Sequence, residues 1–276
     1  MTDIDSPGLV AALRSRVDVE VRFRDSDRAL YATDSSNDRE VPIGVVVPHD
    51  ADALEEAVRV CAAFGAPITH RGGGTALAGQ ATKRTAIIDN SKHCNRFLSI
   101  DSGRRLAVVE PGITLDELQK RCRPHGLRFG PDPATHDHKS LGGMIGNNAA
   151  GPRSVIAGVT SHNVKSLDIL TCDGLRLTVG PTTAEELEQY MAEGGREGAI
   201  HAGLKAPRDR YAGGINRVYP KIPRRVSGFN LDALIPDERG MINVATALVG
   251  TEGTCVTVLS VTLPSVPGRS GAIRSH

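Results

Sequence analysis

Residues 69–80 contain the residue types best suited to holding an anion. Three consecutive glycines at positions 72–74 lie between Arg71 and Thr75. Because glycine has no Cβ, successive backbone N–H groups in such a run can approach a phosphate closely. A glycine-rich connector can also be only a flexible turn. We therefore predict a phosphate-binding loop here and retain the flexible turn as the alternative.

Two better-known phosphate motifs fit this stretch poorly. Gly74 and Gly79 have the spacing that opens a P-loop, but Gln80 and Ala81 replace the Lys and Ser or Thr that should follow. A Rossmann fingerprint needs a helix directly after the glycines and an acidic residue ending a second strand, and neither pattern is present. A nucleoside triphosphatase is disfavoured, while a module that binds a different phosphate ligand remains a distant alternative.

A second glycine cluster lies in residues 130–151. Ser140 can cap a helix in which Gly142, Gly143 and Gly146 fall at positions i, i+1 and i+4. That spacing leaves one helix face bare enough for a flat ligand to approach. The same pattern also suits a small-residue helix packed against another backbone, and the segment alone does not separate the two.

The spacing of the histidines and cysteines gives little support for a metal site or a disulfide framework. His136 and His138 flank Asp137, but two histidines on a loop need further ligands placed by the fold. The five cysteines are widely spaced without a CxxC pair, so neither a disulfide framework nor a zinc or iron–sulfur site is indicated. We predict no metal and a reducing, cytoplasmic location.

The first glycine loop follows a strand–helix–strand pattern. An apolar strand at 43–48, a helix at 52–64 and a strand at 67–69 have the lengths of a parallel βαβ unit. The loop would then lie at the carboxyl end of a strand, where ligands of open α/β sheets bind. A helix at 8–16 and a strand at 17–23 precede this unit on weaker patterns.

The rest of the chain has antiparallel character. Strands are predicted at 86–89 and 106–110, and a capped helix begins at Thr114. Residues 164–179 form a hairpin whose Asp173-Gly174 pair predicts a type I′ turn. A second capped helix begins at Thr183, and a strand follows Gly250.

Composition narrows the class of partner. Lys and Arg number 33 against 32 Asp and Glu, so no basic excess favours nucleic acid or an anionic membrane. Aromatic residues make up 3% of the chain, which argues against platforms for stacked bases. No apolar run reaches membrane-spanning length or forms a signal peptide.

Residues 196–225 are basic and poorly patterned, which usually indicates a solvated surface. A more specific interpretation is that Arg224 or Arg225 binds a substrate carboxylate, for which a guanidinium is the natural partner.

Four motifs together resemble a known family. They are the RGGGT loop at 71–75, the EPG turn at 110–112, the PDPATHD…SLGGMIGNNAAG block at 131–151 and the GTEGT segment at 250–254. In this order they are similar to the FAD-binding (PCMH, vanillyl-alcohol-oxidase type) domain of FAD-linked 2-hydroxy acid oxidases and dehydrogenases, which act on D-lactate, glycolate or D-2-hydroxyglutarate. The resemblance runs from about Tyr31 to Leu263.

The resemblance implies an α+β fold of two subdomains, a small parallel βαβ subdomain and a larger, mainly antiparallel sheet with flanking helices, with noncovalent FAD between them. Noncovalent binding is implied because some relatives carry a flavin-linked histidine at the place of Thr75. The implied cofactor-binding residues are Arg71, Gly72, Gly73, Gly74, Thr75, Pro131, Ser140, Leu141, Gly142, Met144, Asn147, Asn148, Glu252 and Gly253. The expected divisions are a lead-in at 1–39, the FAD-binding domain at 40–265, split near 105, and a disordered tail at 266–276.

The family also supplies an expected activity. It implies a flavoprotein oxidoreductase that oxidises a small D-2-hydroxy acid, such as D-lactate or D-2-hydroxyglutarate, by hydride transfer to FAD. The cap domain of the family, with its catalytic residues, has no counterpart in the sequence, so the chain resembles a form truncated before that domain. Turnover would need a cap or an iron–sulfur partner chain. The alternative is an isolated FAD-binding domain with no turnover of its own.

Overall fold

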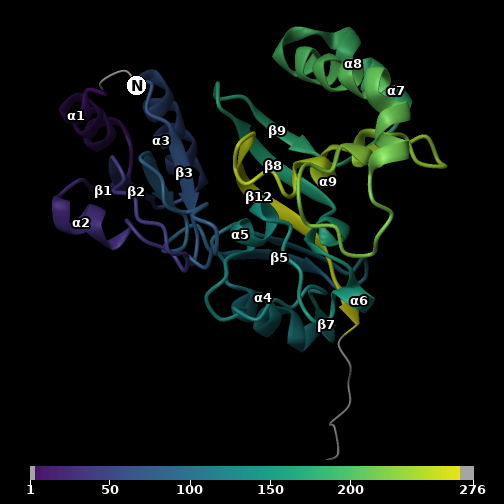
Figure 1. Cartoon of the computed structure of the whole chain (residues 1–276), viewed down its shortest axis with the longest axis horizontal. Coiled ribbons are helices and arrows are strands. Elements are labelled where there is room, and N and C mark those ends of the chain that lie inside the picture. The colour runs from purple at the N-terminus through teal and green to yellow at the C-terminus, as the bar shows by residue number, and fades with distance from the viewer. Residues whose placement is uncertain (1–3, 268–276) are drawn as a thin grey trace, which may run out of the picture.

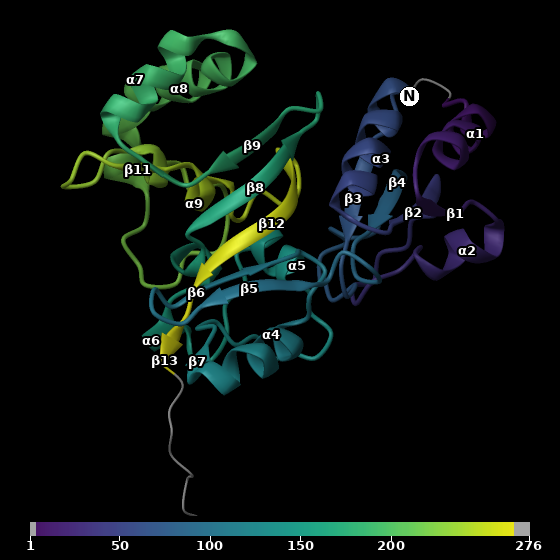
Figure 2. The same ribbon diagram turned by 180° about the vertical axis from the view of Figure 1, so that it is seen from behind.

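The computed structural model describes residues 4–267, and these form two subdomains built on separate sheets (Figure 1). The first subdomain occupies the purple and blue side of the view, and the second the teal to yellow side. The reverse view shows the same separation (Figure 2). The predicted fold class is therefore confirmed, with a smaller, largely parallel sheet beside a larger antiparallel one.

The first sheet has the order β1-β2-β4-β3. β2 (Gly44–Pro48) and β3 (Ile68–Arg71) both pair parallel to β4 (Ala86–Asp89), while β1 (Val19–Arg22) is an antiparallel edge strand. α3 (Ala51–Ala63) links β2 to β3, as the apolar periodicity predicts.

Both faces of this sheet are covered. α1 (Ser6–Arg16) packs with α3 on one face, where Leu9 and Leu13 are fully buried. Tyr31, just after α2 (Asp25–Leu30), packs on the other face. Residues 6–31 thus belong to the first subdomain, unlike the lead-in expected for 1–39, because their apolar side chains complete its core.

The second sheet has the order β5-β6-β12-β8-β9, with antiparallel pairing throughout. Its bounds are β5 (Phe97–Asp101), β6 (Leu106–Val109), β8 (Ser166–Thr171), β9 (Arg176–Val179) and β12 (Val256–Pro264). β5 was not predicted, and its pairing with β6 puts the division between subdomains before Phe97 rather than near 105.

The β8–β9 hairpin is confirmed, but its turn differs from the predicted type I′. Thr171 O accepts from Gly174 N, so Cys172 and Asp173 are the central residues of the turn. Gly174 then takes a φ of +85° and Thr171 N donates to Leu175 O, which is the geometry of a turn followed by a bulge.

Helices and short strands surround the second sheet. α4 (Leu115–Cys122) and α5 (Leu141–Gly146) contribute to its main core, beside the short α6 (Ser154–Ala157) and α9 (Val244–Leu248). The remaining short elements are β7 (Leu127–Arg128), β10 (Pro181–Thr182), β11 (Ile242–Asn243), β13 (Val266–Pro267) and the 3₁₀ turns Arg123–His125, Thr160–Asn163 and Leu231–Leu234.

α7 (Ala184–Glu193) and α8 (Gly195–Val218) form a hairpin that projects away from both sheets in the two views (Figures 1 and 2). α8 covers most of the basic stretch that showed no helical pattern, because only a few of its side chains are buried.

The expected disordered tail begins differently, since Val266–Pro267 pairs with β7. Residues 268–276 lie outside the described part of the chain.

Candidate functional site

The first glycine loop directly follows β3 and contacts the second subdomain. A Cβ on Gly72 would lie 2.0 Å from Ser140 Oγ, and one on Gly73 would lie 2.1 Å from the His138 carbonyl oxygen. Gly74 has a φ of +65°, a conformation that side chains other than glycine rarely adopt. The glycines are therefore required by close contact with residues 138–140, which is the second of the two predicted clusters.

The Arg71 side chain hydrogen-bonds to the segments on either side of this loop in space. Its guanidinium donates to Thr33 O at 2.8 Å and to Ala81 O at 3.1 Å, and it lies 5.7 Å from the centre of the Tyr31 ring. The charged group of Arg71 is thus used to join three loops, while its backbone leads into the glycines.

α5 places the second cluster against the first. Ser140 caps the helix by accepting from Gly143 N at 3.2 Å. Gly142 N donates to Pro111 O at 2.7 Å, and a Cβ there would lie 2.9 Å from Pro111 Cβ. This contact brings the EPG turn beside α5.

The other end of α5 meets residues 250–253. Gly250 N donates to Ile145 O at 2.8 Å and Glu252 N donates to Gly146 O at 2.9 Å. Glu252 and Gly253 both have positive φ, at 54° and 70°. Four sequence-distant motifs therefore converge on one place.

A cavity of about 590 Å³ opens at this convergence, between the two subdomains. Its size falls within the range of cofactor pockets. The sequence-predicted residues that line it are Arg71, Gly72, Gly73, Gly74, Thr75, Ser140, Gly142, Asn147, Glu252 and Gly253.

Four other predicted residues are not among the residues that line this cavity. Leu141 and Met144 are fully buried and point into the core of the second subdomain. Asn148 accepts from Ser161 N at 2.9 Å and donates to Arg225 O, so its side chain joins protein loops. Pro131 is buried outside the lining.

Three buried polar atoms in the cavity wall have no partner among residues 4–267. They are Nδ1 of His70, Oδ1 of Asn90 and Oδ1 of Asn147. Since buried polar groups nearly always form hydrogen bonds, these atoms indicate a ligand that supplies the missing partners. Asn90 was missed by sequence analysis, although its place just after β4, at the same sheet edge as the glycine loop, was a usable signal.

His70 joins the two subdomains across the floor of the cavity. It lies on β3, and its Nε2 is 2.7 Å from Thr257 Oγ1 on β12. Burial of the imidazole lowers the pKa of His70 to about 4, so the ring is neutral at neutral pH. A neutral imidazole can offer its second nitrogen to a ligand.

Lys139 and Glu252 bring opposite charges to the cavity wall. Burial lowers the pKa of Lys139, and it raises the pKa of Glu252, although Lys139 opposes the latter shift. Each charge is destabilised by the loss of water, and an anionic ligand would favour the charged form of Lys139.

The predicted carboxylate-binding arginines lie apart from this cavity. The Arg225 guanidinium donates to Asn230 Oδ1 at 3.1 Å, pairs with Asp232 and lies 4.6 Å from the centre of the Tyr219 ring. It lines a second cavity of about 290 Å³. Arg224 is exposed.

Among residues 4–267, the structure gathers no group of three or more metal ligands around either of the loop histidines considered for a metal. His136 Nδ1 is 2.7 Å from Asp116 Oδ1, and His138 pairs loosely with Asp137. Each is an exposed polar contact.

Residues 42–180, about half of the chain, match the family model described as FAD binding domain. The chain belongs to this FAD-binding domain family. FAD is therefore the cofactor, and the unpartnered atoms and bare glycine backbone of the cavity fit a ligand with both a diphosphate and a polar ring system.

Curated relatives of this FAD-binding domain are longer proteins named as dehydrogenases and oxidase subunits. The chain is 33% identical over 246 residues to D-2-hydroxyglutarate dehydrogenase of Pseudomonas putida. The matched region covers 87% of this chain and 24% of the relative. The chain is 30% identical over 183 residues to glycolate oxidase subunit GlcD of Escherichia coli, covering 65% of this chain and 37% of that protein. The chain thus matches about a quarter of the first relative's length and somewhat more than a third of the second's.

The fold has solved counterparts. A structure of alkyldihydroxyacetonephosphate synthase superposes with a TM-score of 0.65 at 18% identity, covering 95% of this chain and 40% of that one. This likeness supports the two-subdomain architecture. Within residues 4–267 no helix is long and apolar enough to cross a membrane.

Proposed function

We propose that this FAD-binding domain serves a FAD-dependent oxidoreductase that oxidises a D-2-hydroxy acid, with FAD bound noncovalently. The observation that carries the proposal is the convergence of Gly72–Gly74, Gly142 and Gly253 on one cavity whose wall contains unpartnered buried polar atoms. The relatives named D-2-hydroxyglutarate dehydrogenase and glycolate oxidase subunit GlcD support the substrate class, because both names refer to 2-hydroxy acids.

Each part of the cavity has a proposed role. The backbone of Gly72, Gly73, Gly74 and Thr75 binds the diphosphate, with Lys139 near enough to contribute charge. Asn90, Asn147 and the Nδ1 atom of His70 hydrogen-bond the polar edges of the cofactor. When bound, FAD supplies a two-electron acceptor, and the chain's own residues position it and exclude water.

The substrate side is proposed to depend on further protein. Among the residues that line the cavity, Arg71 is the one arginine, and its guanidinium already donates to two carbonyl oxygens. Arg224 and Arg225 remain candidates for a substrate carboxylate, although Arg225 would have to leave Asp232. We propose that a cap domain or a partner chain, with or without an iron–sulfur cluster, completes the site in the cytoplasm.

A second candidate function is cofactor binding without turnover. The hydrogen bonds of Arg71 to backbone carbonyl oxygens favour cofactor binding without turnover. The described cavity wall contains no other arginine that could bind a substrate carboxylate.

One anaerobic experiment separates these functions. The purified chain is reconstituted with FAD, and its visible flavin absorption is followed after addition of D-2-hydroxyglutarate or D-lactate. Bleaching by the chain alone, or after the proteins that co-purify with it are added back, supports the oxidoreductase, and a yellow colour that persists in both conditions supports the second candidate. Failure to retain FAD would overturn both.

A further inference from the structure

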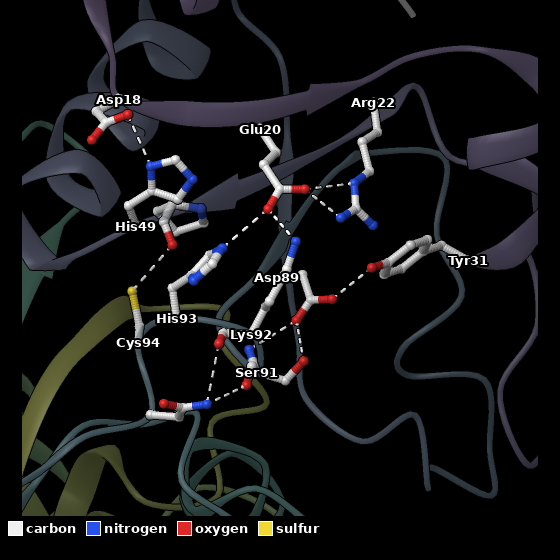
Figure 3. Close-up of polar contacts among 12 residues, drawn as sticks. Asp18, Glu20, Arg22, Tyr31, His49, Asp89, Ser91, Lys92, His93 and Cys94 are labelled. Atoms are coloured by element: carbon white, nitrogen blue, oxygen red, sulfur yellow. Dashed lines mark hydrogen bonds and ion pairs between the residues drawn. The ribbon is translucent and has the colours of Figure 1, made fainter.

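Two histidines and a glutamate form a compact cluster outside the cofactor cavity. Glu20 comes from β1, His49 directly follows β2, and His93 lies in the loop after β4 (Figure 3). One possible ligand atom from each residue lies within 4.8 Å of the other two. None of the three lines the cofactor cavity.

Neighbouring groups orient both imidazoles. Asp18 Oδ1 lies 2.8 Å from His49 Nδ1, which leaves His49 Nε2 as the ring nitrogen available to a ligand (Figure 3). His93 Nε2 lies 3.0 Å from Glu20 Oε1. The two rings meet edge to face, with centres 4.7 Å apart. A carboxylate that fixes a histidine from behind is the usual outer support of a metal-binding imidazole.

The loop that carries His93 is held by its own hydrogen bonds. Asp89 Oδ1 accepts from Ser91 N at 2.8 Å, and its other oxygen accepts from Tyr31 Oη at 2.6 Å. Cys94 Sγ donates to Pro48 O at 3.6 Å, which ties the loop to the end of β2 beside His49. The fold therefore holds the backbone that carries His49 and His93 in place before any ion binds.

We propose that Glu20, His49 and His93 bind a divalent transition-metal ion, with Zn²⁺ as the best-suited ion. Two imidazole nitrogens and one carboxylate oxygen form a set that Zn²⁺ accepts, whereas Mg²⁺ and Ca²⁺ prefer sites made of oxygen atoms. The three side chains are 28–36% exposed, so water can occupy a fourth position.

A cationic side chain now occupies part of this site. Arg22 contacts Glu20 Oε2, while Lys92 contacts Oε1, the oxygen nearest His93. Lys92 is 48% exposed on a flexible stem, so it can withdraw and give Oε1 to the metal, while Arg22 stays on Oε2. The metal therefore competes with the Lys92 ammonium, and removal of that ammonium should tighten binding.

Zn²⁺ titration calorimetry on the untagged full chain tests the site. The background is the Cys172→Ser/Cys255→Ser protein, because both thiols are exposed and thiolates bind zinc. We expect one Zn²⁺ per chain, no comparable binding of Mg²⁺, and at least about tenfold weaker Zn²⁺ binding in His49→Gln and in His93→Gln. Asp18→Asn should weaken binding by about 10–100-fold, since it removes the support of His49.

Two further variants make the test decisive. His125→Gln alters an exposed histidine of the second subdomain, in the 3₁₀ turn Arg123–His125, and should bind Zn²⁺ like the background protein. Lys92→Ala should bind Zn²⁺ more tightly, a gain that misfolding does not produce. The proposal is overturned if the background protein binds no Zn²⁺, if His49→Gln and His93→Gln bind like His125→Gln, or if Lys92→Ala binds more weakly.

Discussion

Gly73 accepts no Cβ without movement of the backbone, since the added atom would lie 2.1 Å from the His138 carbonyl oxygen. We expect Gly73→Ala to destabilise the fold by about 1–3 kcal/mol, as overpacked sites do, and to weaken FAD binding because the loop is displaced. Flavin fluorescence titration and thermal unfolding measure the two effects. Gly203→Ala, where the added Cβ meets nothing within 4 Å, is the control and should leave FAD affinity unchanged.

His70 gives the fold a defined pH dependence. Its pKa is about 4 in the folded chain, against an ordinary value of 6.5. As the pH falls below 6.5, His70 becomes protonated in the unfolded chain. In the folded chain it stays neutral until the pH reaches about 4. The stability due to neutral His70 is thus complete above pH 6.5 and is lost between these values, by up to about 3 kcal/mol.

Urea titrations of the FAD-free chain across this pH range check the effect. The loss on acidification should shrink in His70→Gln and persist in His125→Gln. Equal pH dependence in both variants would exclude the proposed burial of a neutral imidazole.

At the residue scale, sequence was informative where the residue type itself encodes backbone geometry. The glycines at 72–74 and at 142 were selected because a residue without a Cβ lets the backbone approach a ligand, and in the structure the same lack of a Cβ permits close contact with residues 138–140 and Pro111. Their contact with FAD stays a prediction. Leu141 and Met144 were included with the ligand contacts because a family motif also contains core residues, and their side chains lie in the core of the second subdomain. His70, Asn90 and Lys139 were missed because only the tertiary fold brings them to the same cavity.

Ser140 is the link between an element and the site, because it caps α5, the helix that touches both the EPG turn and residues 250–253. We expect Ser140→Ala to cost about 1 kcal/mol of stability and also to weaken FAD binding. Thr183→Ala removes the matched cap of α7, which lies outside the cavity lining, and should cost similar stability without affecting FAD. If both variants bind FAD equally, α5 does not position the cofactor.

Elements with a strong local signal were predicted well. The β2–α3–β3 unit and the β8–β9 hairpin follow from apolar periodicity and turn residues. β5 was missed because its side chains do not alternate between buried and exposed, although its partner β6 follows it after a short loop. α8 was missed because a helix exposed over most of its surface has no apolar stripe to reveal it.

At the scale of the whole molecule, the subdomains share an apolar contact. Leu54 and Val58 of α3 pack with Ile88, Leu170 and Leu259, which links both sheets. We expect Leu259→Ala to destabilise the chain by about 2–5 kcal/mol while keeping one unfolding transition in urea, followed by circular dichroism. Val155→Ala, at a site 91% exposed, should change stability by less than about 0.5 kcal/mol. Two separate transitions in Leu259→Ala would show that the subdomains unfold independently.

The central claim is that loops from both subdomains enclose one FAD. Amide hydrogen exchange of the chain with and without FAD tests it most directly, because it reports every loop at once. We predict that FAD slows exchange together at residues 72–75, 140–147 and 250–253. Protection confined to one of these segments, or centred on residues 215–232 around the second cavity, would contradict the claim.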